Sequence, residues 1–310
     1  MRFASGVVML SLLLAHASPS RAQVDERLAA YTGRNAKGYL EPLVNAFRSN
    51  LNAGLFTTAY VPRRDLYVSL ELVAMATFFD EDSRTFMATT EGDFLPVTTV
   101  EAPTIVGDNE AVYVDGVAGT QYAFPGGFDI DNIWFGAPQL RVGSIFGTEA
   151  MGRFILYDTG IEELGDLTVW GVGMRHSVSQ YIERMHPVDA ALAVTYQAGD
   201  LVNDGGNRVL KSSVLSASLH TGIALGGIYP YMGLTVNRFD LDLHYEFEED
   251  WDLAPINLNF DYEEEFQLTL GISYRLGVIA AYGEYNWASQ SSLATGLSVT
   301  VPPNSRSATP

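Results

Sequence analysis

Apolar and polar residues alternate along much of the chain, which is the pattern of β-strands rather than of helices. The clearest stretch is 266–276. Its apolar set is Phe266, Leu268, Leu270, Ile272, Tyr274 and Leu276, and its other set is Gln267, Thr269, Gly271, Ser273 and Arg275. Successive strand residues point to opposite sides, so this stretch would have one apolar and one largely polar face. A helix would mix the two sets, and we therefore predict a strand here.

The same alternation predicts further strands. They lie at 66–78, 190–197 and 297–301, and near 110–124, 133–146, 151–158, 167–179, 209–225, 229–248 and 278–288. Leu55–Val61 is one more candidate. Many of these strands are longer than the ~5–6 residues typical of soluble sheets. They match or exceed the ~9–11 residues that a tilted strand needs to cross a bilayer.

Strands that cross a membrane close into a barrel, because lipid offers no hydrogen-bond partner to an open sheet edge. We therefore predict an all-β fold, an antiparallel transmembrane β-barrel over residues 55–301. Bacterial barrels favour even strand numbers, and we expect about twelve strands, within a range of about ten to fourteen. A β-sandwich or lipocalin-like barrel also alternates, with its apolar face inward, and stays open as the water-soluble alternative.

The first residues have the composition of a secretory signal peptide. Arg2 supplies the positive charge, Val7–Leu14 is a short apolar run, and the small residues Ser20 and Ala22 precede the expected cleavage site. The run is too short to span ~30 Å of hydrocarbon as a helix. We expect residues 1–22 to send the chain through the general secretory route to the outer membrane of a bacterium. At the other end, residues 302–310 have the composition of a frayed tail.

Composition narrows the possible partners. The chain has no cysteine, which excludes disulfides and thiolate metal sites. Its 18 basic and 37 acidic residues give a net charge of −19. Such an excess of carboxylates repels phosphates, so we expect no nucleic-acid partner. Hydrophobic residues make up 47% of the chain, too many for a disordered protein.

An amphipathic helix is predicted ahead of the strands. Its apolar face consists of Leu40, Leu43, Val44, Phe47 and Leu51, spaced as neighbours on one side of a helix. Pro42 favours the first turn, which places the helix start near Glu41, and Gly54 is a suitable stop. We expect the segment 23–54 to plug the barrel lumen or to act as a movable hatch.

This helical segment, from Gly38–Leu43 through Asn50–Gly54, resembles an uncharacterised family of bacterial proteins of unknown function. Those proteins look like outer-membrane barrels with an N-terminal helix, and the resemblance extends over most of the chain after the signal peptide. More distantly, the chain resembles the long-chain fatty-acid transporters, whose N-terminal segment forms a hatch in a barrel. Their Asn-Pro-Ala hatch motif is missing and this chain is shorter. The resemblance therefore implies a fold but assigns no functional residue.

Aromatic residues at the two ends of 229–248 suggest which strand face meets lipid. Tyr229 and Tyr231 at one end, and Tyr245 and Phe247 at the other, have the arrangement of two interfacial girdles. We therefore expect the odd positions to face outward, with a bulge near Val236 correcting the register. The even positions would then line the lumen together with polar residues of 266–276. The expected lumen residues are Arg238, Asp240, Asp242, His244, Gln267, Thr269 and Arg275.

Catalytic motifs are scarce. The histidines after the signal peptide are His176, His186, His220 and His244, and none lies in a His-Glu-x-x-His zinc motif. Ser216, Ser218 and His220 share one strand face and are the nearest approach to a Ser–His pair, which a lipid-modifying enzyme would hold on the barrel exterior. Polar residues that alternate on one strand more often line a lumen. We expect no catalytic residue, no cofactor and no metal site.

Acidic residues gather around 251–259. They are Glu246, Glu248, Glu249, Asp250 and Asp252 before that tip, and Asp261, Glu263, Glu264 and Glu265 after it. Carboxylate oxygens bind divalent cations, and we expect a solvated outer loop that such cations cross-link to lipopolysaccharide.

Three functions stay open at this level. The first is a pore or transporter for a small or hydrophobic solute, with the N-terminal helix as plug or hatch. The second is a structural or surface-interaction barrel with a plugged lumen, and the third is an outer-membrane lipid-modifying enzyme.

Overall fold

The computed structural model describes residues 27–302, except 159–164, 183, 185, 204 and 247–254. The expected signal peptide, the tail from residue 303 and most of the acidic loop lie outside the described residues.

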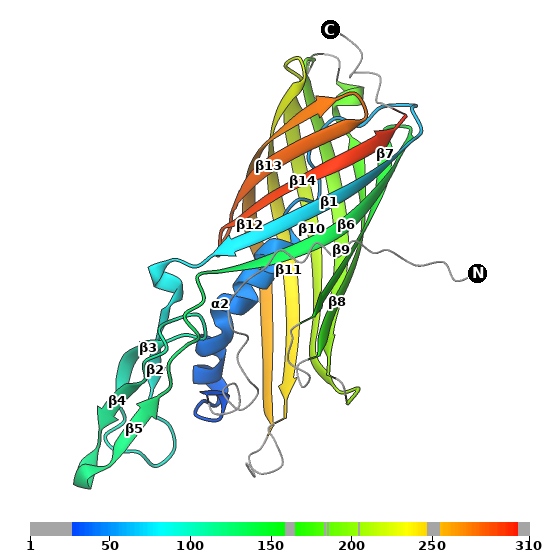
Figure 1. Ribbon diagram of the computed structural model, residues 1–310. Coiled ribbons are helices and arrows are strands. Elements are labelled where there is room, and N and C mark those ends of the chain that lie inside the picture. Colours follow the sequence, from blue (N-terminus) through cyan, green and yellow to red (C-terminus); the bar gives the residue numbers. More distant parts are fainter. Residues whose placement is uncertain are drawn as a thin grey trace.

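Ten antiparallel strands form a closed barrel (Figure 1). They are β1 (Tyr67–Phe78), β6 (Asn132–Ile145), β7 (Thr148–Asp158), β8 (Asp166–Ser177), β9 (Val188–Val202), β10 (Arg208–Ile223), β11 (Ile228–Tyr245), β12 (Ile256–Leu276), β13 (Ile279–Trp287) and β14 (Ser292–Val301). Strand β1 closes the wall by pairing with β14 on one side and β6 on the other. The predicted all-β antiparallel barrel is confirmed.

The barrel has fewer strands than the twelve we took as most favoured, although ten lies within the expected range. Residues 110–124 form no wall strand but the small hairpin β4 (Val112–Asp115) and β5 (Gln121–Phe124). A second hairpin, β2 (Thr85–Thr89) and β3 (Thr99–Pro103), precedes it. Leu55–Val61 is not a strand and runs through the lumen, because its neighbours are the inward side chains of the wall.

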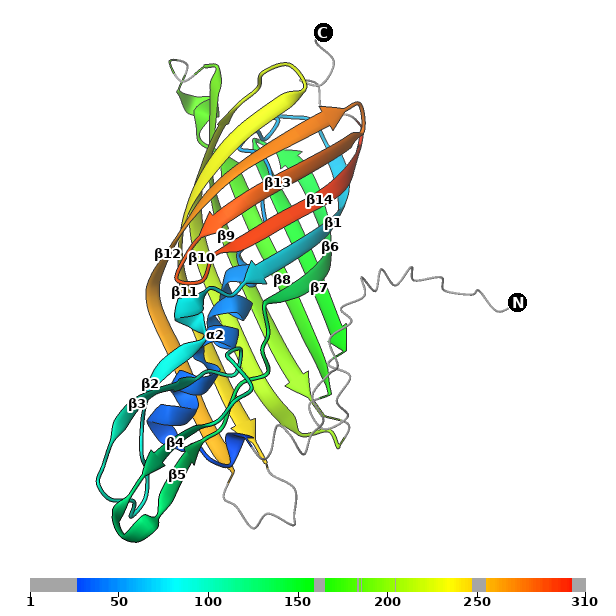
Figure 2. The same ribbon diagram turned by 60° about the vertical axis from the view of Figure 1, so that its left-hand side comes forward.

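The two ends of the barrel differ in their connections. One end, called here the short-turn end, carries brief turns such as those around Gly147 and Gly277, and β1 begins and β14 ends there. The opposite, long-loop end carries the excursion 79–131 with both hairpins, and β11 ends and β12 begins there (Figures 1 and 2). The 3-10 helices η1 (Glu81–Ser83) and η2 (Val117–Gly119) lie in the excursion, and η3 (Ser179–Tyr181) lies between β8 and β9.

Apolar side chains of the wall point outward and polar ones point inward. In β1, Leu70 and Leu72 are 57% and 62% exposed, whereas the intervening Glu71 is 1% exposed. The same alternation places Gln267 and Thr269 of β12 inside, between exposed leucines. A water-soluble barrel would have the opposite orientation, so the arrangement contradicts that alternative.

Pairs of aromatic rings mark the outer face towards the long-loop end. Phe78 packs against Trp134, Trp170 against Tyr196, and Tyr285 against Trp287, with ring centroids 6.0, 5.7 and 4.4 Å apart. Each of these residues lies in the half of its strand nearer that end. A ring of aromatic side chains at the edge of an apolar band is typical of the water interface of a membrane barrel.

Strands β11 and β12 continue beyond this aromatic ring, and their polarity reverses there. Phe239 and Leu241 of β11 and Phe260 of β12 point inward and are buried, whereas Arg238 and Asp261 lie outside. The reversal on β12 is achieved by a bulge, because Asn237 pairs with Glu265 while Phe239 pairs with Tyr262. The expected bulge near Val236 is therefore on the partner strand.

Helix α2 (Gly33–Leu51) fills the space inside this extension. It enters from the long-loop end, with its first half beside β2 and β3 and its second half inside the wall (Figure 2). The predicted apolar face, Leu40, Leu43, Val44, Phe47 and Leu51, belongs to the core or packs against it.

The predicted helix start near Glu41 is wrong, since α2 begins at Gly33 and contains Pro42 in its interior. A proline there loses one backbone hydrogen bond and crowds the carbonyl four residues earlier. Burial of the first half compensates. Tyr39 packs against Tyr31, which in turn packs against Phe124 of β5, and the Ile105 N–H donates to the Tyr39 carbonyl at 2.9 Å. Burial also raises the pKa of Tyr39 to about 12, despite the nearby Arg27.

Candidate functional site: the filled lumen

The chain after α2 passes along the barrel axis from Asn52 to Val61, and the wall holds its backbone by hydrogen bonds. Gln197 donates to the Leu51 carbonyl at 2.6 Å and Gln139 to the Leu55 carbonyl at 3.1 Å. In the other direction, the Gly54 N–H donates to Glu284 at 2.6 Å. The last carbonyls of a helix lack partners within the helix, so Gln197 completes the C-terminus of α2, and the other two bonds hold the chain that follows it.

Charge also favours this position of the helix end. The Arg153 guanidinium lies 3.4 Å from the Leu51 carbonyl, where the helix dipole is negative. Side chains of α2 add further bonds to the wall: Ser49 to Ser292 at 3.0 Å, and Asn50 to Thr77 at 2.7 Å. We call the segment Gly33–Val61 the plug, because the second half of α2 and the chain after it occupy the lumen.

An ionic cluster connects the wall to the plug. Glu149 lies 2.5 Å from Arg175 and 3.7 Å from Arg141, and Arg141 also pairs with Glu71. All four side chains are at most 4% exposed. Arg175 donates to the Thr58 carbonyl and lies 4.9 Å from the centre of the Phe56 ring. Two acids and two bases balance, so the buried cluster carries no net charge at neutral pH.

None of these four charged residues was singled out from the sequence. A charge between apolar strand neighbours, such as Arg141 between Leu140 and Val142, is the signal that could have found them. Glu149 and Arg175 are direct cross-strand partners in the β7–β8 register, which the sequence does not reveal.

Three of the expected lumen residues do face the lumen. Gln267 and Thr269 both donate to the Asn286 side-chain oxygen, at 3.0 and 2.6 Å. Arg275 lies further towards the short-turn end, beside a small cavity.

The other four expected lumen residues are on the outer face, and their prediction is wrong. Arg238, Asp240, Asp242 and His244 alternate with Phe239 and Leu241, which take the inward positions against α2. Arg238 lies near Asp240, Asp261 and Glu263 in an exposed ionic group, and His244 lies 3.3 Å from Glu246. The error arose because the aromatic residues of β11 were assigned to lipid, whereas Tyr231 and Tyr245 point inward.

The candidate Ser–His pair also faces inward. Ser218 lies 2.8 Å from His220 Nε2, but His220 is buried with its ring against Phe56 of the plug. Ser216 donates to the plug residue Asn52 at 2.6 Å instead of joining the pair. The pair is therefore separated from the barrel exterior, where the enzyme hypothesis required it.

Two further features bear on ligands. Among the described residues, no group of three or more His, Cys, Asp or Glu side chains is arranged to hold a metal ion. Most of the acidic loop lies outside those residues, so its cross-linking to lipopolysaccharide stays a prediction.

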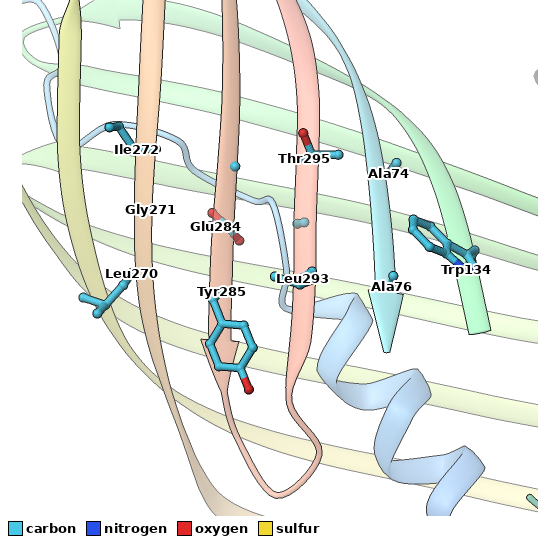
Figure 3. Close-up of a pocket in the computed structure, with 12 residues that line it drawn as sticks. Ala74, Ala76, Trp134, Leu270, Gly271, Ile272, Glu284, Tyr285, Leu293 and Thr295 are labelled. Atoms are coloured by element: carbon cyan, nitrogen blue, oxygen red, sulfur yellow. The ribbon is translucent and has the colours of Figure 1, made fainter. Parts of the chain in front are cut away.

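On the outer wall, a groove of about 580 Å³ runs over β12, β13, β14, β1 and β6 (Figure 3). Ala74, Ala76 and Trp134 line it, and it faces away from the lumen.

The fold and the lumen define an antiparallel barrel that resembles bacterial outer-membrane proteins and carries an N-terminal plug. The chain belongs to a family of unknown function (DUF6588), whose model matches residues 1–301. No curated protein matches it. In the part of the chain that the structure describes, no helix has the length and apolar character needed to cross a membrane.

Comparison with solved structures finds matches of low similarity. The toluene transporter TbuX of Ralstonia pickettii is 8% identical, with 87% of this chain and 94% of that chain covered and a TM-score of 0.29. The outer membrane protease OmpT of Escherichia coli is 7% identical, with coverages of 78% and 96% and a TM-score of 0.29. A FadL homologue of Pseudomonas aeruginosa is 8% identical, with coverages of 91% and 96% and a TM-score of 0.25. These similarities concern the fold alone.

Proposed function

We propose that this protein is an outer-membrane barrel that its own plug keeps closed and that holds an acidic binding module outside the cell. The observation that carries the proposal is that the second half of α2 and the chain after it occupy the lumen and are bonded to the inner face of the wall. Short turns of such barrels lie in the periplasm and longer loops outside. The long-loop end, with the excursion 79–131, is accordingly assigned to the cell surface.

The excursion 79–131 is the binding module of this proposal. It contains eleven acidic residues and a single base, Arg84, which pairs with Asp129 and Asp131. Exposed apolar side chains accompany this charge, among them Leu95, Val97 and Val117, which are 57%, 66% and 58% exposed. The Val117 N–H donates to the Leu95 carbonyl at 2.9 Å, so these residues share one tip of the module. This surface fits a partner that presents basic and apolar side chains together.

A cationic probe tests the module. A fluorescent oligolysine should bind the folded protein. The triple variant Asp93→Asn, Glu110→Gln and Asp115→Asn should weaken that binding. The electrostatic attraction between the acidic module and the basic probe, although screened by salt, falls with each negative charge removed. The matched control neutralises Asp240, Asp242 and Asp261 of the barrel wall. Equal weakening by both variants would show that overall acidity, and not the module, attracts the probe.

The closed lumen predicts electrical silence. Purified protein inserted in planar bilayers should give no stable single-channel steps, because the plug occupies the lumen and is bonded to the wall. Steady channels from the unmodified protein would contradict the proposal.

A transporter whose plug moves as a hatch is the second candidate, favoured by a cavity beside Thr57 and Tyr60, where the plug does not fill the short-turn end. The chain has no cysteine, so the variant Ser49→Cys with Ser292→Cys would form a single new disulfide where the two hydroxyls lie 3.0 Å apart. In cells, uptake of a hydrophobic dye should be the same with the disulfide formed and reduced if the barrel is closed. Dye uptake that appears only after reduction would favour the hatch.

A further inference from the structure

A small cavity opens into the lumen at the short-turn end, beside the ionic cluster, with which it shares Thr58. Its volume is about 130 Å³. That is several times the ~10–15 Å³ that one water molecule needs. The plug residues Thr57, Thr58 and Tyr60 form one side, and the β10–β11 turn from Ala224 to Ile228 forms another. The inner faces of β12, β13 and β14 complete it with Ser273, Arg275, Tyr282 and Ser298.

Arg275 brings a positive charge to this cavity without a counter-charge. Its Nη1 atom is buried and has no hydrogen-bond partner, and among the described residues no carboxylate lies within 4.0 Å of its guanidinium. Carboxylates are not scarce, since the chain has 37 acidic residues against 18 basic ones. The nearby lumen acids Glu71 and Glu149 are already paired with Arg141 and Arg175. Arg275 is half-buried, and a positive charge that the described part of the chain leaves unpaired favours binding of an anion beside it.

Tyr282 also lines this cavity, and its hydroxyl lies against Gly54 and Gly296. Its hydroxyl is buried and has no hydrogen-bond partner in the described structure. In the β12–β13 register, Tyr282 lies opposite Ser273, and Arg275 is the next inward residue along β12. Diagonal neighbours of this kind are ~7–8 Å apart, within reach of two long side chains around one ligand.

The lining chemistry identifies the class of ligand. The cavity is lined by a guanidinium, phenols and aliphatic hydroxyls, and no aspartate or glutamate is among its lining residues. A guanidinium matches the geometry of carboxylates and phosphates, and hydroxyl groups donate to the same oxygens. We propose that this cavity binds a small oxyanion, a carboxylate or a phosphate group, between Arg275 and Tyr282. Because Thr57, Thr58 and Tyr60 of the plug form one side of it, the site exists while the plug occupies the lumen.

Direct binding tests this proposal. Equilibrium dialysis of the detergent-solubilised full-length protein with radiolabelled acetate and, separately, inorganic phosphate should show saturable binding of at least one of them at one site per chain. Arg275→Gln should weaken that binding at least about tenfold, because hydrogen bonds to charged groups contribute ~1.5–3 kcal/mol. Tyr282→Phe, which removes only the hydroxyl, should weaken it less.

Arg238→Gln is the matched control, because it removes the same charge from the exposed outer face. It should leave binding unchanged. Preference for acetate or for phosphate decides which oxyanion the site takes. Absence of saturable binding of both at millimolar concentration, or binding that neither Arg275→Gln nor Tyr282→Phe alters in folded protein, would overturn the proposal.

Discussion

Replacing Glu149 by glutamine should destabilise the barrel by about 3–5 kcal/mol, the range for removing one partner of a buried ion pair. Glu149 lies 2.5 Å from Arg175 and 3.7 Å from Arg141, and it also accepts from the Tyr67 hydroxyl. Glutamine nearly preserves the shape but removes the charge. One arginine then stays buried in the lumen without compensation. Urea unfolding in lipid vesicles, followed by tryptophan fluorescence, measures the loss.

An exposed acid of the same barrel provides the control for Glu149. Asp261 lies 3.7 Å from Arg238, with side chains 43% and 54% exposed, so Asp261→Asn should cost at most about 1 kcal/mol. Adding Arg175→Met to Glu149→Gln should recover part of the loss, because the uncompensated charge disappears. Equal stability of the Glu149→Gln variant and the unmodified protein would mean that water screens the cluster and that the lumen is wet.

Alternation was sufficient to predict most of the wall. Strand 266–276 was expected from its period and lies within β12, and β1 was placed to within one residue of its start. Both strands have an apolar face with few interruptions, so a register shift would expose polar groups to the wrong side. Alternation also predicted a strand over the residues of the hairpin β4–β5. A two-residue repeat therefore identifies strands but does not say which sheet they join.

The residues of β11 alone could not show which of its two faces points into the lumen. Its outward positions change from Leu234 and Val236 to Arg238 and Asp240, and its inward ones change from Thr235 and Asn237 to Phe239 and Leu241. Each face is therefore half apolar and half polar. The reversal occurs where the strand passes the aromatic ring and meets α2, and both facts depend on segments remote in the chain. The Arg275 cavity depends in the same way on three strands, a turn and the plug.

Placing an arginine at Leu72 should prevent or strongly weaken folding into a bilayer. Leu72 is the sixth of the twelve residues of β1, points outward, and pairs with Leu297 and Pro138 on the neighbouring strands. An arginine facing lipid near the middle of a membrane barrel costs ~2–4 kcal/mol, and the cost falls to ~0–1 near the interfaces. Urea titration of folding into lipid vesicles, with heat-modifiable migration on gels as a second readout, measures this loss.

The comparison with Asn257→Arg makes the test specific for lipid. Asn257 is also on the outer face, but on the part of β12 beyond the aromatic ring, where Asp242 and His244 are its exposed neighbours. This substitution loses an exposed hydrogen bond to His244, but the new positive charge meets water and nearby carboxylates, so its effect should stay within about 1 kcal/mol. If the outer wall faced water along its whole length, both arginines would be tolerated equally, because a lone charge on a hydrated strand loses none of its solvation. A cost confined to Leu72 therefore measures the lipid contact itself, separately from strand propensity and from packing in the lumen.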